Sequence, residues 1–254
     1  MAVELYDDVV IGFVPSTPAT PHTEIYPTTT ANDSLIEFAM TLGYPVGYLQ
    51  EQEGQIVQNI VPVHKTESRQ ISTSSKVELA LHTETAFHPY KPDYVLLLCV
   101  RGDPSAETTF ATLDDILPQL DKQTIDTLMN PWFITGVDES FRTNGEEDVE
   151  IPLSVLQEID GDWELTYDAS VMNGVNDAAR SALLELENAI NRSVRAVALK
   201  TAQLLVIDNR KAVHGRRPFT PKYDGRDRWL KRVLVVKQLP PDNDYSNGVI
   251  TTKF

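Results

Sequence analysis

Residues 81–88 read Leu-His-Thr-Glu-Thr-Ala-Phe-His, a polar stretch with two imidazoles and one carboxylate. An alternating segment, residues 76–82, leads into it, and the apolar run Tyr-Val-Leu-Leu-Leu-Cys-Val of residues 94–100 follows it. Alternation has the period of a half-buried strand, and a short apolar run is typical of a buried one. The sequence therefore predicts two strands with a polar connection between them, and we expect the chemistry of the chain in that connection.

His82 and Glu84 lie at the end of the alternating segment. Val77, Leu79 and Leu81 occupy the opposite parity, so the two polar side chains point the same way if the extended backbone continues. An imidazole and a carboxylate in this arrangement are half of a metal site, which needs a second histidine from elsewhere in the chain.

The second histidine has few candidates, because the chain contains only His22, His64, His82, His88 and His214. His214 is favoured, since it follows a strand-like apolar run, residues 202–208, and precedes Gly215, which permits close approach of the backbone. Two histidines and one carboxylate leave three positions of an octahedral iron open, enough for a bidentate co-substrate and dioxygen. His82, Glu84 and His214 are thus expected to bind iron, and a zinc hydrolase is the less natural interpretation.

The sequence resembles the clavaminate synthase-like branch of the iron(II), 2-oxoglutarate-dependent oxygenases, whose amino-acid hydroxylases carry a Leu-His-Thr-Glu-x-Ala-Phe-His signature. The similarity extends from about residue 42 to residue 237 and includes residues 42–46, 54–62, 81–88, 94–101, 167–168, 214–216 and 223–230. Thr85 departs from the acidic or amide residue that is common at this position in the relatives, and the N-terminal region is shorter than in typical members. Both departures concern the substrate rather than the metal.

This resemblance implies a mainly β fold with peripheral helices, namely a double-stranded β-helix or jelly roll. It also implies Fe(II), with 2-oxoglutarate as co-substrate and dioxygen as oxidant. The implied reaction is hydroxylation of an unactivated carbon, C3, of a free L-amino acid, and a basic amino acid such as L-arginine is a candidate. The many short strand-like segments and few helices of the chain independently favour a double-sheet β architecture.

Two arginines receive roles from the resemblance. Arg228 lies 14 residues after His214, the offset at which the family places the arginine for the distal carboxylate of 2-oxoglutarate. A guanidinium fork suits that carboxylate better than an ammonium group. Arg232 shares a face with Arg228 in a predicted strand, and a charge inside a barrel needs an anionic partner, so it is assigned to the substrate carboxylate. The alternative for both is a solvent-facing arginine.

Further side chains complete the expected site. In the resembling hydroxylases, an aspartate in the Tyr-Asp context of Asp168 contacts an amine, amide or guanidinium of the substrate; the alternative is a turn aspartate. Glu84 is assigned a second role towards the substrate α-ammonium, and Gln58 is a candidate substrate contact. Thr108 or Thr109 offers a hydroxyl to the co-substrate carboxylate, and Thr109 is the first choice.

The other three histidines are not expected to bind the metal. His22 belongs to a second His-Thr-Glu triplet, residues 22–24, in a loop rich in proline and threonine that has no strand to fix it. His64 is expected on the surface, before a serine-rich, charged loop, residues 65–75, whose composition is typical of a mobile lid. His88 is expected to support the site.

Composition and charge limit the classes of function. Of the 254 residues, 41% are hydrophobic and 23% charged, as expected of one domain, residues 1–254, with a sizeable core. The net charge of −15 opposes binding to nucleic acid or an anionic membrane. The single cysteine, Cys99, is expected to be buried, and without a signal-like or membrane-spanning segment the chain is expected to be soluble and cytoplasmic.

Local patterns predict the remaining elements. Helices are expected at residues 34–42, opened by a capping box at Ser34 and Glu37, at residues 113–128 with an interruption at Pro118 and a restart near Asp121, and at residues 177–190, capped by Asn176 or Asp177. Further strands are expected at residues 8–14, 55–63, 163–168 and 233–236, and residues 144–148 are expected to form an acidic, solvated turn.

Two rival functions remain open on the sequence alone. One is the same chemistry on another small acid, such as a sulfonate, or a desaturation; the other is a non-catalytic jelly-roll binding protein. Hydroxylation of a free amino acid is favoured, because a binding module has no need of Arg228 at its offset from a complete triad. The expected partner is a small-molecule amino acid, and the oligomeric state is left open.

Overall fold

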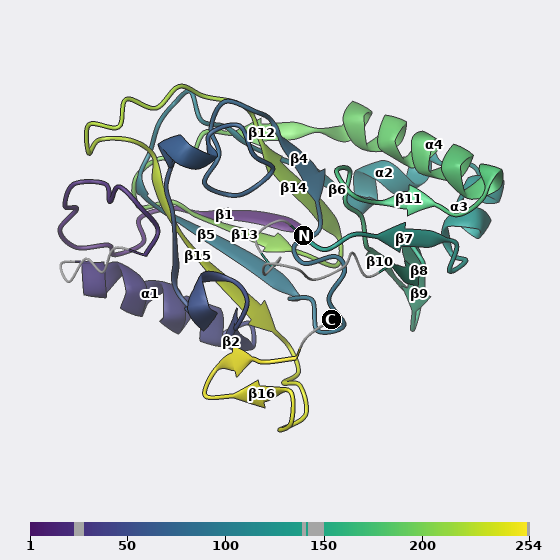
Figure 1. Cartoon of the computed structure of the whole chain (residues 1–254), viewed down its shortest axis with the longest axis horizontal. Coiled ribbons are helices and arrows are strands. Elements are labelled where there is room, and N and C mark those ends of the chain that lie inside the picture. The colour runs from purple at the N-terminus through teal and green to yellow at the C-terminus, as the bar shows by residue number, and fades with distance from the viewer. Residues whose placement is uncertain (23–27, 139–140, 142–149, 253–254) are drawn as a thin grey trace.

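The structure, a computed structural model, describes residues 1–22, 28–138, 141 and 150–252 (Figure 1). The largest sheet in these ranges contains β1 (Val3–Tyr6), β13 (Leu204–Asp208), β5 (Tyr94–Arg101), β15 (Trp229–Val236), β2 (Tyr44–Tyr48), β17 (Val249–Ile250) and β16 (Tyr245–Ser246), in that order, and β3 (Gln58–Ile60) pairs with β15. A second sheet has the order β12 (Arg195–Val197), β6 (Thr108–Thr112), β14 (Ala212–Arg216) and β4 (Leu79–His82).

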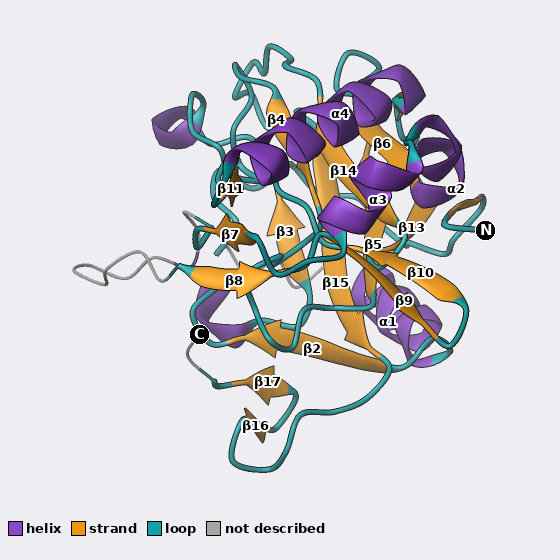
Figure 2. Ribbon diagram, turned by 90° about the vertical axis from the view of Figure 1, so that its right-hand side faces the viewer, coloured by secondary structure: helices purple, strands orange, loops and turns teal. Residues whose placement is uncertain are grey.

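Smaller elements surround these two sheets. Two further sheets consist of β9 (Leu156–Ile159) with β10 (Asp162–Leu165), and of β7 (Phe133–Thr135) between β8 (Ile151–Leu153) and β11 (Asn173–Gly174). The helices are α1 (Thr29–Met40), α2 (Leu113–Ile116), α3 (Lys122–Leu128) and α4 (Asp177–Ser193), with short 3-10 turns η2 (Gln52–Gly54), η3 (His64–Thr66) and η4 (Leu117–Gln119). The chain is thus mainly β with helices at the periphery, as predicted (Figure 2).

The central strand β5 is buried on both faces, which explains its continuous apolar run. Leu96 and Leu98 pack in one cluster with Leu35 of α1. Leu97 and Cys99 alternate with them and belong to the cluster on the opposite face. Burial raises the pKa of the Cys99 thiol to about 12, so this cysteine is the inert core residue that the sequence predicted. The inner face of β5 is therefore left to line the space between the two larger sheets.

Helix α4 covers the outside of the smaller site-bearing sheet (Figure 2). Its buried stripe includes Leu186, which shares a cluster with Ala111 of β6 and Val213 of β14. The helix begins as predicted, because the side-chain oxygen of Asn176 accepts a hydrogen bond of 2.8 Å from the backbone N–H of Ala179. α4 thus fixes the strand that carries His214 from behind.

The Asn176→Ala variant is expected to lower the free energy of unfolding by about 1 kcal/mol, since it removes this helix cap. The midpoint of urea unfolding measures the loss. The site lies on the other side of the sheet, so the affinity for a metal ion should not change, and an unchanged urea midpoint would contradict the capping role.

The helix at residues 113–128 is confirmed with its interruption, because η4 contains Pro118 and the side chain of Asp121 caps α3. The predicted start of the first helix is wrong. α1 begins at Thr29 rather than Ser34, and its buried face already includes Ala31. The apolar contacts of that first turn thus outweigh the local capping pattern at Ser34.

The predicted strand at residues 8–14 is also wrong, since the first strand is β1. Asp8 and Gly12 have positive φ angles of 57° and 67°, which break an extended backbone. Three other predicted strands are shorter than expected: β3 replaces residues 55–63, β4 begins at Leu79, and β10 ends at Leu165. The strand predicted at residues 233–236 is confirmed within β15.

The serine-rich loop at residues 65–75 folds back on itself. Val63 donates its backbone N–H to Thr73 O, and Ser75 and Lys76 donate theirs to Glu67 O. The acidic turn predicted at residues 144–148 lies outside the described residues. No helix among the described residues has the length and apolar character needed to cross a membrane.

Candidate metal centre and active site

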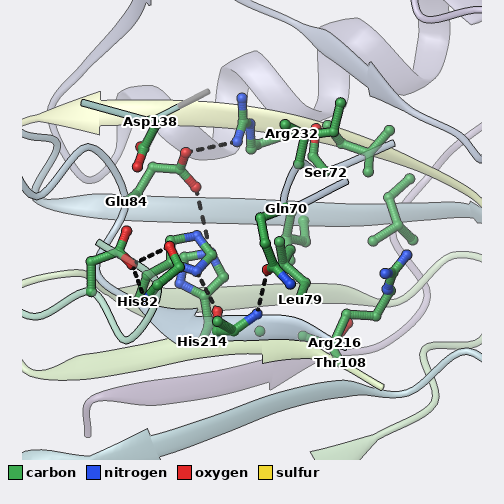
Figure 3. A pocket seen from close by; sticks show the side chains of 18 of the residues that line it. Gln70, Ser72, Leu79, His82, Glu84, Thr108, Asp138, His214, Arg216 and Arg232 are labelled. Atoms are coloured by element: carbon green, nitrogen blue, oxygen red, sulfur yellow. Dashed lines mark hydrogen bonds and ion pairs between the residues drawn. The ribbon is translucent and has the colours of Figure 1, made fainter. Parts of the chain in front are cut away.

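His82, Glu84 and His214 converge in the structure (Figure 3). His82 ends β4 and pairs across the ladder with His214 of β14. One ligand atom from each of the three side chains lies within 4.8 Å of the other two, and the two imidazole centroids are 4.6 Å apart. Glu84 and His214 are buried and His82 is half-buried. The three donors can therefore hold one metal ion from one side.

The protonation states of these side chains fit a metal. His82 Nδ1 lies 2.8 Å from the carbonyl oxygen of Ala80, so Nδ1 carries the proton and leaves Nε2 free to coordinate. Burial, together with the neighbouring imidazole, lowers the pKa of His214 and keeps it neutral. Burial works to raise the pKa of Glu84, but the charge of Arg232 and the hydrogen bond with His214 hold it below its usual range. Glu84 and His214 are thus deprotonated, as metal ligands must be.

The backbone reaches Glu84 by a turn and not by the continuing strand that would align the side chains of His82 and Glu84. β4 ends at His82, and Thr85 has a positive φ of 50°. The backbone N–H of Thr83 donates to Tyr167 O, and that of Glu84 donates to Asn209 Oδ1 at 2.7 Å. The carboxylate faces His82 because these contacts fix the turn.

A pocket between the two larger sheets contains the triad (Figure 3). It is lined by Glu51, Ile60, Gln70, Ile71, Ser72, Leu79, Ala80, His82, Glu84, Leu97, Thr108, Asp138, Asp168, Ser170, His214, Gly215, Arg216, Arg228, Leu230 and Arg232. Of the predicted site residues, Arg228, Arg232 and Asp168 line it with the triad, whereas Thr109 and Gln58 do not.

One end of the pocket is cationic. Arg228 is buried, and its Nη2 donates to Thr108 Oγ1 at 3.1 Å. Arg216 is also buried and donates to the backbone oxygens of Ser74 and Val77. Burial lowers the pKa of both guanidiniums to about 10, and the charge of Arg228 adds to the effect on Arg216. Neither forms an ion pair with a carboxylate of the described chain, so this end suits an anionic ligand.

The first choice of Thr109 is corrected to Thr108. Neighbouring residues of a strand point to opposite faces. Thr108 pairs with Arg216 and shares the pocket face with it, whereas Thr109 pairs with Gly215 and its hydroxyl, although buried, meets no hydrogen-bond partner among the described residues.

Arg232 sits in a network of buried charges beside the triad. Its Nη1 donates to Glu84 Oε1 at 2.8 Å and its Nε donates to Gln58 Oε1 at 2.8 Å. Its Nη2 donates to Glu51, and Gln58 Nε2 lies 3.4 Å from the other Glu51 oxygen. Gln58, which was expected to contact the substrate, therefore orients Arg232 and Glu51 and does not itself line the pocket.

Two further carboxylates, Asp138 and Asp168, line the same pocket, and Figure 3 shows Asp138 beside Glu84. Asp168 is buried, and its Oδ1 accepts hydrogen bonds from Ser170 N at 2.7 Å and Ser170 Oγ at 2.6 Å. Burial and the charges of Asp168 and Glu84 raise the pKa of Asp138 well above its usual value. Within the described ranges no lysine or arginine forms an ion pair with Asp138 or Asp168. This part of the pocket is complementary to a cation.

Glu51 and Asp138 line the pocket but could not be recognised from the sequence. Both follow ordinary turn-like contexts, and Glu51 is flanked by Gln50, Gln52 and Glu53, so no local signal separates it from a solvated acid. The pairing of Gln58 with Arg232 across β3 and β15 was the only available hint, and it needs the strand register.

The other histidines do not reach the triad. His88 Nδ1 accepts the backbone N–H of Tyr90 at 3.0 Å, and the ring packs on Tyr48 with a centroid distance of 5.0 Å. Burial lowers the pKa of His88 to about 4, so it is neutral. His22 and His64 are exposed. Of the second His-Thr-Glu triplet, the residues after His22 lie outside the described chain.

Two histidines and one carboxylate on a β scaffold, with open positions and a buried arginine nearby, define the class of mononuclear non-haem iron oxygenases. The chain belongs to the family described as "Taurine catabolism dioxygenase TauD, TfdA family", whose model matches residues 28–234. The sequence resemblance to iron(II), 2-oxoglutarate-dependent oxygenases is thereby confirmed.

Named relatives fall in the predicted branch. The chain is 39% identical over 207 residues to L-asparagine oxygenase of Streptomyces coelicolor, covering 81% of this chain and 61% of the relative. It is 37% identical over 203 residues to L-lysine 3-hydroxylase of Catenulispora acidiphila, covering 77% of this chain and 56% of the relative. The chain thus spans less than two thirds of the length of either enzyme.

Solved structures share the fold. Asparagine oxygenase in complex with Fe(II), 2S,3S-3-hydroxyasparagine and succinate matches with a TM-score of 0.89 and 32% identity, over 99% of this chain and 80% of the other. The non-haem iron oxygenase OrfP with Fe and alpha-ketoglutaric acid matches with a TM-score of 0.84 and 31% identity, over 94% of this chain and 76% of the other. The predicted jelly roll is confirmed.

Proposed function

We propose that the protein is an Fe(II), 2-oxoglutarate-dependent hydroxylase that oxidises C3 of a free L-amino acid with a basic side chain. The observation that carries the proposal is the His82, Glu84 and His214 triad, flanked in one pocket by the Arg232–Glu51 pair and by Arg228, which has no carboxylate partner in the part of the chain that the structure describes. C3 is supported by the names of the relatives, an L-lysine 3-hydroxylase and an enzyme solved with 3-hydroxyasparagine.

The position of 2-oxoglutarate is inferred from the positive charge at one end of the pocket. Arg228, with Thr108 beside it, holds the distal carboxylate of 2-oxoglutarate, since a buried guanidinium without a carboxylate partner gains a charge-assisted pair there. His82, Glu84 and His214 hold the metal. When bound, Fe(II) supplies the reaction of dioxygen with 2-oxoglutarate, which yields succinate and carbon dioxide and removes hydrogen from an unactivated carbon.

The α-amino and α-carboxylate groups of the substrate fit the network around Arg232. In the free protein Glu51 and Glu84 both contact this guanidinium. An amino-acid zwitterion carries the same two charges, so its carboxylate takes donors of Arg232 while its ammonium pairs with Glu51. No buried charge is left uncompensated by this exchange, which avoids the large cost of an unpaired ion. Glu51 thus joins Glu84 as an acceptor for the ammonium group.

The side chain of the substrate is proposed to be cationic, because Asp138 and Asp168 face the pocket without a cationic partner among the described residues. A guanidinium or ammonium group between them stabilises both ionised carboxylates.

The location of the protein in a reducing cytoplasm stays a prediction of the sequence.

The Asp168→Asn variant tests this side-chain subsite. It keeps the shape but removes one charge, and a lost charge-assisted hydrogen bond costs about 1.5–3 kcal/mol, or roughly 10- to 100-fold in KM for the basic amino acid. Succinate formation without an amino acid should stay near wild type. An unchanged KM for every basic amino acid in this variant would contradict the cationic subsite.

The activity itself is tested by incubating the protein with Fe(II), 2-oxoglutarate and each of the twenty amino acids, ornithine and homoarginine. Substrate-stimulated succinate release should accompany a mass gain of one oxygen in one basic amino acid. A mass loss of two hydrogens would instead mark a desaturation, and stimulation by a sulfonate would replace the amino acid as substrate. No stimulation by any of these acids would leave the binding-protein alternative.

A further inference from the structure

We infer that Asn209 is the positioning residue of the metal carboxylate: its side-chain amide holds the backbone of Glu84 where no strand does. The inference rests on the proposed function, since it assumes that Glu84 binds the metal. Asn209 is fully buried in the turn between β13 and β14 and does not line the pocket.

The side-chain amide of Asn209 forms hydrogen bonds with both the backbone N–H and the backbone carbonyl of Glu84. Its Oδ1 accepts the Glu84 N–H at 2.7 Å, and its Nδ2 donates to the Glu84 carbonyl at 3.1 Å. This is the pair of bonds that a neighbouring strand would supply. Nδ2 also donates to the carbonyl of Pro92 at 2.9 Å, so three of the four hydrogen bonds available to the amide are made.

The backbone of Glu84 needs these hydrogen bonds because no neighbouring strand of the described chain pairs with it. The ladder between β4 and β14 ends at His82, and Thr85 adopts a left-handed conformation that a β-strand cannot continue. Glu84 lies between these two points and carries a buried carboxylate that also contacts Arg232. Without the Asn209 amide, the Glu84 N–H and carbonyl would lose the partners that fix the direction of its side chain.

The position of Asn209 links two ligand-bearing segments. Asn209 is the first residue after β13, a strand of the larger sheet. A short turn then leads into β14, the strand that carries His214. Its own N–H donates to Asp93 O at 2.8 Å, and the next residue, Arg210, donates to Asp93 Oδ1 at 2.9 Å. The turn that leads to His214 is therefore tied to the segment that carries Glu84, and the distance between the two ligands depends on Asn209.

Two variants test the inference. Asn209→Ala removes all three bonds, whereas Asn209→Asp keeps the shape and the acceptor for the Glu84 N–H but turns a carboxylate oxygen towards two carbonyl oxygens. Groups that orient metal ligands typically contribute 10- to 100-fold to metal affinity, so we expect the dissociation constant of Co(II) to rise by about that factor in both. The visible absorption of bound Co(II), which reports the ligand set, should change as well.

The control is Asn176→Ala, which removes the cap of α4 at a residue that does not line the pocket. It should lower stability yet leave Co(II) affinity and absorption unchanged, which separates positioning from general destabilisation. Circular dichroism establishes that each variant is folded; if Asn209→Ala does not fold, the isosteric Asn209→Asp decides. Binding within twofold of wild type with an unchanged spectrum in Asn209→Asp would overturn the inference alone. Failure of the wild-type protein to bind Co(II) or Fe(II) would instead overturn the proposed function.

Discussion

The His82→Ala and Glu84→Gln variants are expected to lose metal binding and all substrate-dependent succinate formation. Each removes one of three protein ligands whose donor atoms lie within 4.8 Å of one another, and two ligands no longer hold one face of an octahedral ion. Glu84→Gln keeps the size of the side chain and a hydrogen-bond acceptor for Arg232, and circular dichroism establishes that the variant is folded. Anaerobic titration with Fe(II) and succinate release measure the two effects.

The His22→Ala variant is the matched control, because it changes the other His-Thr-Glu triplet of the chain. His22 is exposed and lies away from the pocket, so metal affinity and turnover should stay close to wild type. Wild-type turnover in His82→Ala, or a loss of turnover in His22→Ala, would move the metal site from one triplet to the other.

The metal triad could be predicted because two of its residues are neighbours in the sequence and the third has a distinctive context. His82 and Glu84 lie in a short signature, and few histidines compete for the remaining position. The helix α4 and the buried strands β5 and β15 were equally accessible, since their apolar periodicity is long or continuous. Local patterns suffice where one segment carries the whole signal.

Residues whose roles depend on strand register could not be predicted. Gln58 meets Arg232 because β3 pairs with β15, and Glu51 reaches the same guanidinium from the segment just before η2. Asp138 meets Asp168 through the packing of separate loops. Thr108 and Thr109 are chemically alike, so only the pairing of β6 with β14 decides which hydroxyl faces the pocket. A pattern along the chain contains none of these distances.

Two wrong predictions of secondary structure, the start of α1 and the strand at residues 8–14, have the same physical origin. The capping pattern at Ser34 is a local preference worth about 1 kcal/mol, whereas the first turn of α1 buries apolar side chains against the sheet. The apolar residues at 8–14 resemble a strand, yet the left-handed positions at Asp8 and Gly12 are compatible with packing under α1 and not with a ladder. Tertiary contacts outweigh local propensity in both places.

The second large effect on turnover is expected from substitutions of Arg228 and Arg232, and the two substitutions should impair different steps. Arg228→Ala should raise the KM for 2-oxoglutarate by roughly 10- to 100-fold, the equivalent of a lost charge-assisted contact of about 1.5–3 kcal/mol. It should also depress the slow succinate formation that occurs without an amino acid, because the co-substrate loses its distal anchor. Arg228→Lys should recover only part of the affinity, since an ammonium cannot reproduce the guanidinium fork.

Removal of the Arg232 side chain should affect the amino acid rather than the co-substrate, the opposite of Arg228→Ala. Succinate formation without an amino acid should persist, while stimulation by the amino acid disappears, because the α-carboxylate loses its partner. Arg232→Ala alone leaves Glu51 and Glu84 buried without their cation, a change that costs on the order of 3–5 kcal/mol. The double variant Arg232→Met/Glu51→Gln removes one of these charges together with the guanidinium, so it is the better test of binding in a folded protein.

The two phenotypes separate co-substrate binding from amino-acid binding in one assay, with succinate measured at varied 2-oxoglutarate in the presence and absence of the amino acid. Arg228 contacts Thr108 at the cationic end, whereas Arg232 contacts Glu51 and Glu84, so one ligand cannot use both in the same way. If both variants show the same co-substrate defect, or if the double variant is still stimulated by the amino acid, Arg232 does not bind the substrate carboxylate. The charge network around Arg232 then serves only to hold Glu84 towards the metal.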